Sequence, residues 1–311
     1  MKELKLAPVG SFMHCREGFG EAIGHHGELL QGVFESDGGR LRRGLVSLPC
    51  PNLRSKARFL ANGEMQVSVS PQSCEKAKRA AALTLNTFAQ TGIGGNVTIN
   101  SNIAIGRGMG SSTADVVATI LAVLDYLNVQ TSIDRVMQIA VEAETACDST
   151  LFSQHAVLFA QREGLVIEAF TNSLPNVDII SIDAAPAQSV DTVTFKPAEY
   201  SHIEIETFRS LLALLRHAIK TSNLKLLGRV ATASARINQR FLPKPHLDRI
   251  EEIGVRHGAI GMQVAHSGTV VGLMFDPEDE KNAAHMELAT RDLRRSGFEQ
   301  SILHTTSVSC R

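Results

Sequence analysis

Residues 106–115 have the sequence GRGMGSSTAD, which places three glycines and two serines within seven residues. The preceding stretch GNVTINSNI (95–103) alternates apolar and polar residues, as a half-buried strand does. The following run VVATILAVLDYL (116–127) predicts a helix over residues 112–127. A glycine-rich turn between a strand and a helix aims unpaired backbone N–H groups at an anion, and glycines let a phosphate approach the backbone closely. The sequence therefore favours a phosphate site here, with a tight serine-capped turn as the alternative interpretation.

The composition limits the class of protein. The chain has 311 residues, a formal net charge of −1 and 43% hydrophobic residues, which suffices for a packed core in one large or two modest domains. Such a charge gives no bulk attraction to nucleic acid or anionic membranes, and no run reaches the roughly 18 apolar residues of a membrane span. The start lacks the apolar core of a secretory signal, and the five cysteines are scattered without CxxC spacing. We expect a cytoplasmic protein with a small-molecule partner, no nucleic acid and no membrane.

Segments of both hydrophobic periodicities alternate along the chain. Strands are predicted at 44–50, 56–61, 65–70, 95–103, 156–160, 164–170, 259–266, 269–275 and 300–308, and helices at 74–92, 112–127, 133–145, 206–221, 225–238 and after Pro277. The Asn62-Gly63 pair predicts a hairpin between its two neighbouring strands. This mixture, without a strict βαβ alternation, favours an α+β fold. Residues 171–191 contain two prolines and many small polar residues, which predicts a boundary between domains 1–172 and 173–311.

Other nucleophile and nucleotide motifs fit poorly. No lysine stands between the last glycine of 106–115 and the serines that follow it, so the loop is not a Walker loop. It is not a dinucleotide-binding loop either, because the ribose-binding acid of that motif, about 20 residues further on, would fall inside an apolar helix. The chain lacks the G-x-S-x-G elbow of serine hydrolases. Cys147 beside Asp148 is conceivable as a nucleophile, but nothing in the sequence aims a histidine at it.

The segment IAIGRGMGSSTAD (103–115) resembles the signature of the GHMP kinases, the small-molecule kinases that include galactokinase, homoserine kinase, mevalonate kinase and phosphomevalonate kinase. GHHGELLQG (24–32), CDSTLF (147–152) and GMQVAHSGTVVGL (261–273) add to the resemblance, in the family's order. Ala104 stands where the family has proline and Met109 where it has leucine, and neither change removes a phosphate-facing group. The resemblance implies a two-domain α+β fold with a nucleotide cleft between the domains. Within the family, the L-threonine kinase branch of cobalamin synthesis is the most similar.

The resemblance also implies ATP and Mg²⁺ as cofactors and assigns residues to them. The implied ATP- and phosphate-binding residues are Gly106, Gly108, Gly110, Ser111, Ser112 and Thr113. Ser112 and Glu144 are implied to ligate Mg²⁺, a cation that prefers hard oxygen ligands, with Glu142 as the alternative acid. The catalytic pair would be Glu144 and Asp148, with Asp148 as the general base or the group that orients the alcohol. These two acids are four residues apart and would share a helix face if the helix extended that far.

The implied substrate-binding residues are His25, Glu28, Gln31, His266, Ser267 and Gly268. A carboxylate at Glu28 could meet the ammonium group of an amino-acid substrate in a charge-assisted hydrogen bond, and Gln31 could add an amide contact. A zinc site at His25-His26 is disfavoured, because adjacent residues on a strand point to opposite faces. These histidines either line the pocket or lie in a plain loop. Around His266 the alternative is an ordinary Ser-Gly turn.

Taken together, the residues and the resemblance predict a phosphotransferase with an alcohol acceptor. The predicted reaction is ATP-dependent phosphorylation of L-threonine to O-phospho-L-threonine for the aminopropanol linker of cobalamin, by direct in-line transfer. The alternatives are a kinase for another small alcohol, such as serine, homoserine or a secondary-metabolite precursor, and an inactive ATP-binding sensor. Glu144, Asp148 and the two serines favour an enzyme, because a sensor has no need of the acids. The sequence leaves the oligomeric state open, with a homodimer among the options.

Overall fold

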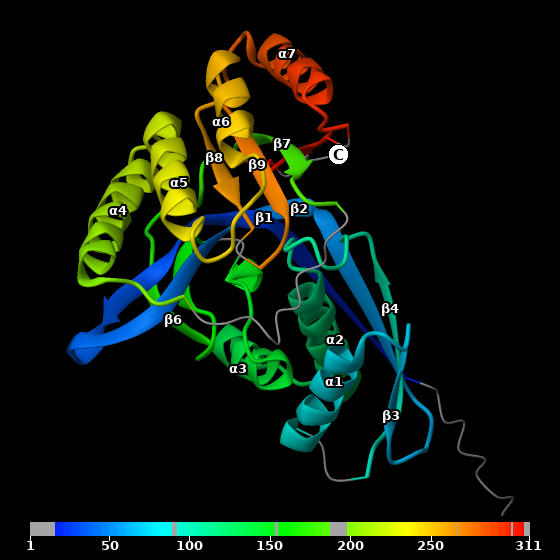
Figure 1. Cartoon of the computed structure of the whole chain (residues 1–311). Coiled ribbons are helices and arrows are strands. Elements are labelled where there is room, and N and C mark those ends of the chain that lie inside the picture. The colour runs from blue at the N-terminus through cyan, green and yellow to red at the C-terminus, as the bar shows by residue number, and fades with distance from the viewer. Residues whose placement is uncertain are drawn as a thin grey trace, which may run out of the picture.

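The computed structural model describes residues 16–88, 92–152, 155–186, 198–265, 267–299 and 301–307. The ten strands of these residues are β1 Glu17–Ser36, β2 Arg40–Ala61, β3 Val67–Ser70, β4 Gly95–Ser101, β5 Val157–Ala160, β6 Leu165–Ala169, β7 Asp178–Asp183, β8 Gly261–Val264, β9 Val270–Phe275 and β10 Ser301–Thr305. They form one sheet in the order β10-β7-β9-β8-β1-β2-β4-β3, with β5 paired to β2 and β6 to β5. Figure 1 shows this sheet running through the molecule.

Seven α-helices of the described residues cover the sheet. They are α1 Glu75–Phe88, α2 Ser111–Leu127, α3 Ile133–Glu144, α4 His202–Lys220, α5 Leu224–Asn238, α6 Leu247–Arg256 and α7 Asn282–Arg295, and short 3₁₀ turns span Asp37–Gly39 and Thr150–Phe152. Helices α1–α3 pack with β1, β2 and β4 around one apolar core, and α4 and α5 pack on β1 around a second. Helix α6 packs on β8 and β9, and α7 packs against α6 and β10, around a third (Figure 1). No helix of the described residues is both long and apolar enough to cross a bilayer.

The long antiparallel hairpin of β1 and β2 is the centre of the sheet, because β8 pairs with β1 on one side and β4 with β2 on the other. The β1–β2 register shifts between Ile23 and Gly24, and again on both sides of Glu28. Such bulges re-aim neighbouring side chains and are frequent beside active sites. Here they lie in the predicted substrate segment, where His25, His26 and Glu28 are all buried.

The predicted α+β class is confirmed, and so are most predicted helices and strands. The predicted hairpin at Asn62-Gly63 is wrong: β4 lies between β2 and β3, pairing antiparallel with β2 and parallel with β3. The strands predicted at 44–50 and 56–61 are parts of one strand, β2. Strands β1 and β7 and helix α6 correspond to no predicted element. The boundary at 172/173 stays a prediction; it falls between β6 and β7, and the sheet continues across it.

Candidate active site

The glycine-rich loop connects β4 to α2, and its geometry explains its composition. Gly106, Gly108 and Gly110 have φ angles of 74°, 77° and 75°, a left-handed conformation that favours glycine. Gly110 is the N-cap of α2 and offers no side-chain acceptor, so the first N–H groups of the helix have no partner inside it. A Cβ on Gly110 would lie 2.5 Å from Cδ2 of His25. The loop is therefore shaped for an anion and packs tightly against β1.

A buried acid lies next to the first turn of α2. Ser112 Oγ donates to Oε2 of Glu144 at 2.5 Å, and Thr113 Oγ1 donates to Oε1 at 2.6 Å. Burial raises the pKa of Glu144, and the two hydroxyl donors offset this only in part. Lys76 on α1 brings its Nζ to 3.6 Å from Oε2. The predicted pair of Ser112 and Glu144 thus lies together as a set of hard oxygen donors beside a helix N-terminus, which fits Mg²⁺.

Asp148 lies close by, although not in the predicted way. Helix α3 ends at Glu144, and Thr145 has a left-handed φ of 78°, so the helix does not extend to Asp148 and the two acids do not share a helix face. The two carboxylates are linked instead through Thr113, whose Oγ1 lies 3.3 Å from Oδ2 of Asp148. Asp148 therefore sits in the loop after α3 and faces the same turn of α2 as Glu144.

His25 of β1 joins Asp148 to Glu28. Its Nε2 lies 3.0 Å from Oδ2 of Asp148, and its Nδ1 lies 3.2 Å from the carbonyl of Gly27 and 3.7 Å from Oε1 of Glu28. Burial by itself would lower the pKa of His25, but the charges of Asp148 and Glu28 outweigh it and raise that pKa to about 9. The imidazolium in turn keeps the pKa of Asp148 below its usual value, against the effect of burial. At neutral pH, a buried cation thus holds Asp148 ionised.

The donor atoms of His25, Glu28 and Asp148 lie within 4.8 Å of one another, close enough to surround a metal ion. A protonated imidazole has no lone pair to give, so the cluster is better described as a cation between two carboxylates. His26 faces other partners: Nδ1 contacts the amide of Gln263, and its ring lies 5.3 Å from the ring of His304. The two adjacent histidines therefore do not converge on one site.

The loop between β8 and β9 packs against the glycine loop. A Cβ on Gly268 would lie 2.0 Å from the carbonyl oxygen of Arg107, so Gly268 and its neighbour Ser267 are held beside the phosphate loop. His266 lies outside the described residues. Gln31 is engaged through its backbone, because its N–H donates to Ser234 Oγ at 3.1 Å. The substrate role of these residues stays a prediction.

Two lysines near the site had no signal in the sequence. Lysine side chains normally lie in solvent. Lys76, however, approaches Glu144, and Lys244 is only 3% exposed and is affected by the charge of Glu28. Cys147 Sγ donates to Oε1 of Glu144 at 3.1 Å. Burial raises the pKa of the Cys147 thiol well above its usual value, which argues against the nucleophile considered from the sequence.

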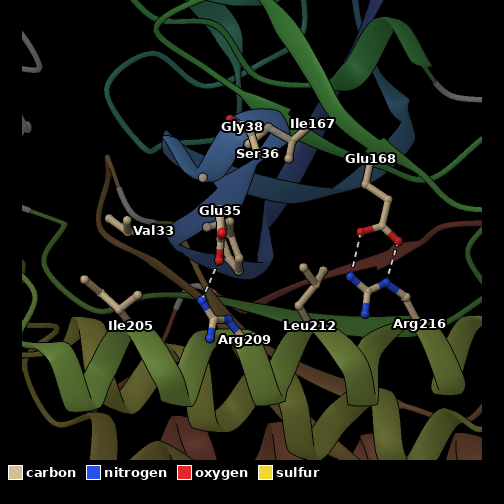
Figure 2. A pocket seen from close by; sticks show the side chains of 12 residues that line it. Val33, Glu35, Ser36, Gly38, Ile167, Glu168, Ile205, Arg209, Leu212 and Arg216 are labelled. Atoms are coloured by element: carbon tan, nitrogen blue, oxygen red, sulfur yellow. Dashed lines mark hydrogen bonds and ion pairs between the residues drawn. The ribbon is translucent and has the colours of Figure 1, made fainter. Parts of the chain in front are cut away.

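A separate hollow of about 460 Å³ opens between the tip of the β1–β2 hairpin and α4 (Figure 2). Two ion pairs cross it, Arg209 to Glu35 at 2.6 Å and Arg216 to Glu168 at 2.5 Å. Its lining contains no residue of the glycine loop or of the acid cluster. Because each arginine already has a carboxylate partner, this hollow is a weaker candidate for the site.

Comparison with known proteins decides the family. Residues 75–158 match the GHMP kinases N terminal domain, and residues 215–290 match the GHMP kinases C terminal domain, which together cover just over half of the chain. The chain belongs to the GHMP kinases. A homoserine kinase structure from Cytophaga hutchinsonii superposes over 98% of each chain with a TM-score of 0.69 at 14% identity. This GHMP kinase therefore has the fold that the resemblance implied, and it is a phosphotransferase that acts on a hydroxyl group.

Two relatives of this GHMP kinase are named L-threonine kinase. The protein from Salmonella typhimurium is 29% identical over 216 residues, which are 67% of this chain and 69% of the relative. The protein from Citrobacter freundii is 31% identical over 188 residues, which are 58% of this chain and 62% of the relative. Kinases of this family depend on ATP and generally use Mg²⁺.

Proposed function

We propose that this GHMP kinase phosphorylates L-threonine with ATP, giving O-phospho-L-threonine for the aminopropanol linker of cobalamin in the cytoplasm. The similarity to two proteins named L-threonine kinase supports the choice of substrate. The observation that carries the chemistry is the pair of the buried His25 and the partly exposed Asp148, which places an ionised carboxylate beside the glycine loop. An ionised carboxylate next to a phosphate site is what proton removal from an acceptor alcohol requires.

The phosphate side of the reaction would be assembled at the start of α2. The backbone N–H groups of residues 111–113 and the left-handed glycines would hold the phosphates of ATP. Ser112 and Glu144 would hold Mg²⁺, which when bound neutralises phosphate charge. Lys76 would add a positive charge at the same place. In such a transfer the protein mainly positions the reactants and stabilises charge.

The acceptor side would be built from β1 and the loop after α3. Asp148 would accept or orient the proton of the acceptor hydroxyl, and His25 would hold the carboxylate in place and in its ionised form. Glu28, which is 2% exposed, would receive the ammonium group of the amino acid. The phosphoryl group would pass directly from ATP to the hydroxyl, because in this kind of transfer the protein mainly positions the two reactants and stabilises charge.

The direct test is ADP release with Mg-ATP across L-threonine, L-serine, L-homoserine, mevalonate and galactose. Selective turnover of L-threonine is the expected result. Selective turnover of another alcohol would keep the kinase and overturn the proposed substrate. Tight ATP binding without turnover of any acceptor would favour the ATP-binding sensor over the enzyme.

A further inference from the structure

Lys244 is a buried cation that the phosphate chemistry does not use. It lies in the turn between α5 and α6 with 3% of its surface exposed, and its Nζ makes one long hydrogen bond, 3.4 Å to the carbonyl of Leu242. No carboxylate of the described residues forms an ion pair with it. Burial lowers the pKa of Lys244 to about 8, while the charge of Glu28 acts in the opposite direction. Burying an ammonium group costs free energy unless an anion pairs with it, so the position of Lys244 indicates a role in binding an anion.

The turn that carries Lys244 is held rigidly. The side chain of Gln239 accepts from the Lys244 N–H at 2.9 Å and donates to the Lys244 carbonyl at 2.7 Å. At the end of α5, the Asn238 amide donates to the carbonyl of Gln31 at 3.0 Å. The turn is thereby anchored to β1, three residues along the strand from Glu28. Lys244 is thus a fixed charge beside the strand that bears Glu28 and His25.

The charges of Lys244 and Glu28 complement those of a free amino acid. Both side chains are buried and of opposite charge, and the helix end that leads into the Lys244 turn is hydrogen-bonded to β1 three residues from Glu28. The backbone part of a zwitterionic amino acid carries an ammonium and a carboxylate on one carbon, so it could pair with both at once. The groups proposed to bind the phosphates of ATP lie at the glycine loop and the start of α2, and Lys244 is not among them.

We propose that Lys244 binds the α-carboxylate of the amino-acid acceptor while Glu28 binds its α-ammonium group. Lys244 then determines specificity: it selects hydroxy amino acids over neutral amino alcohols and sugars of similar size. This inference rests on the proposed function, because it names how that same acceptor is recognised.

The test compares L-threonine with L-threonine amide, which keeps the ammonium and the hydroxyl and loses the negative charge. In the wild type, kcat/KM should favour L-threonine by about 30-fold or more, the scale for losing one partner of a buried charged pair. In Lys244→Met, which keeps the length of the side chain and removes the charge, KM for L-threonine should rise by about 30- to 100-fold with kcat within about threefold. The amide should be used about equally well by both proteins. Lys225→Met, at an exposed position of α5, is the matched control and should change neither acceptor.

Several results would overturn the proposal. They are an undiminished preference for L-threonine in Lys244→Met, an equal loss of kcat with both acceptors, or a raised KM for Mg-ATP in place of the acceptor. Thermal unfolding checks the fold: Lys244→Met should unfold at the same or a higher temperature than the wild type, because a desolvated charge is gone. L-threonine should raise the unfolding temperature of the wild type and not of the variant.

Failure of the proposed function looks different, because the wild type itself would then neither phosphorylate nor bind L-threonine. The same comparison would move to the acceptor that it does use and to the neutral amide of that acceptor. An acceptor without a carboxylate would overturn the role of Lys244.

Discussion

Nε2 of His25 lies 3.0 Å from Oδ2 of Asp148, so a buried residue of the central strand β1 and a partly exposed residue of the loop after α3 form one ion pair. The backbone N–H of His25 also donates to the carbonyl of Met109 in the glycine loop, at 3.1 Å. His25 therefore fixes both the charge state of Asp148 and the distance of Asp148 from the phosphate loop. The proposed function depends on this contact more than on any other.

Replacing Asp148 with Asn should reduce kcat by about 10²- to 10⁴-fold, the usual contribution of a general base. KM for Mg-ATP should stay within about twofold, because in the proposed mechanism Asp148 acts on the acceptor hydroxyl and holds no phosphate. Steady-state kinetics with L-threonine measures both quantities. Asp134→Asn, on the exposed first turn of α3, is the control that should leave both unchanged. Full turnover by Asp148→Asn would remove the base from the mechanism.

Replacing His25 with Gln should move the acid limb of the pH–rate profile to higher pH. The neutral amide can hydrogen-bond to Asp148 but supplies no positive charge, so burial would then raise the pKa of that carboxyl. Below the new pKa, Asp148 is protonated and cannot accept the hydroxyl proton. The measurement is kcat/KM for L-threonine between pH 4.5 and about 9, and a shift of about one unit or more is expected. An unchanged acid limb would mean that His25 does not control the ionisation of Asp148.

His25 should also make folding stability fall as the pH rises. Its pKa is raised from an unfolded value of 6.5 to about 9, so the folded state binds the proton more tightly. The stabilisation is complete below about pH 6.5 and is lost as the pH rises through about 9, by roughly 3 kcal/mol in total. Urea unfolding at pH 6 and pH 9.5 should show a larger loss for the wild type than for His25→Gln. Equal losses in the two proteins would contradict the buried imidazolium.

Replacing Ser112 with Ala should weaken the complex with Mg-ATP. It removes the hydroxyl that lies 2.5 Å from Glu144 and that would complete the magnesium site. We expect KM for Mg-ATP and the Mg²⁺ concentration for half-maximal activity to rise by about tenfold, the effect of one lost polar contact to a charged group. Ser210→Ala on the exposed surface of α4 should leave both quantities unchanged. Unchanged values for Ser112→Ala would exclude the serine as a ligand.

Replacing Gly110 with Ala should abolish activity and destabilise the fold. The new Cβ would lie 2.5 Å from the His25 ring in addition to straining a φ of 75°, so either the loop or His25 must move. Gly63→Ala is a matched control, because Gly63 has a φ of 78° with no atom within 4 Å of the added Cβ. It should cost about 1 kcal/mol from strain and leave activity intact. Equal effects of both substitutions on kcat would show that contact between the loop and His25 is unimportant.

Much of the fold could be predicted because most elements carry their own local signal. Helices α1, α2, α4 and α5 follow from apolar spacing, and the hairpin of β5 and β6 follows from alternation around a glycine. The order of strands in the sheet could not be predicted. Asn62-Gly63 is a strong hairpin signal, but β4 inserts between its strands, and that pairing depends on a segment more than 30 residues away. Strand β7 was missed because it lies in a stretch rich in small polar residues and proline.

The candidate site could be predicted to the extent that its residues stand in short motifs. Ser112, Glu144 and Asp148 were selected from the sequence, and the fold brings them together through Thr113. The partners that tune them come from other parts of the sheet and helices. The ion pair of His25 with Asp148 joins residues 123 positions apart, and Lys244 lies in a turn with no motif. Burial and charge pairing of this kind arise only in the folded chain.

Product analysis measures the proposed reaction itself. The purified protein is incubated with Mg-ATP and L-threonine, and ADP and O-phospho-L-threonine are quantified together by mass spectrometry. One O-phospho-L-threonine is expected for each ADP, with no ADP when the acceptor is omitted. ADP formed without phosphothreonine, or bound ATP that is never consumed, would overturn the proposed L-threonine kinase.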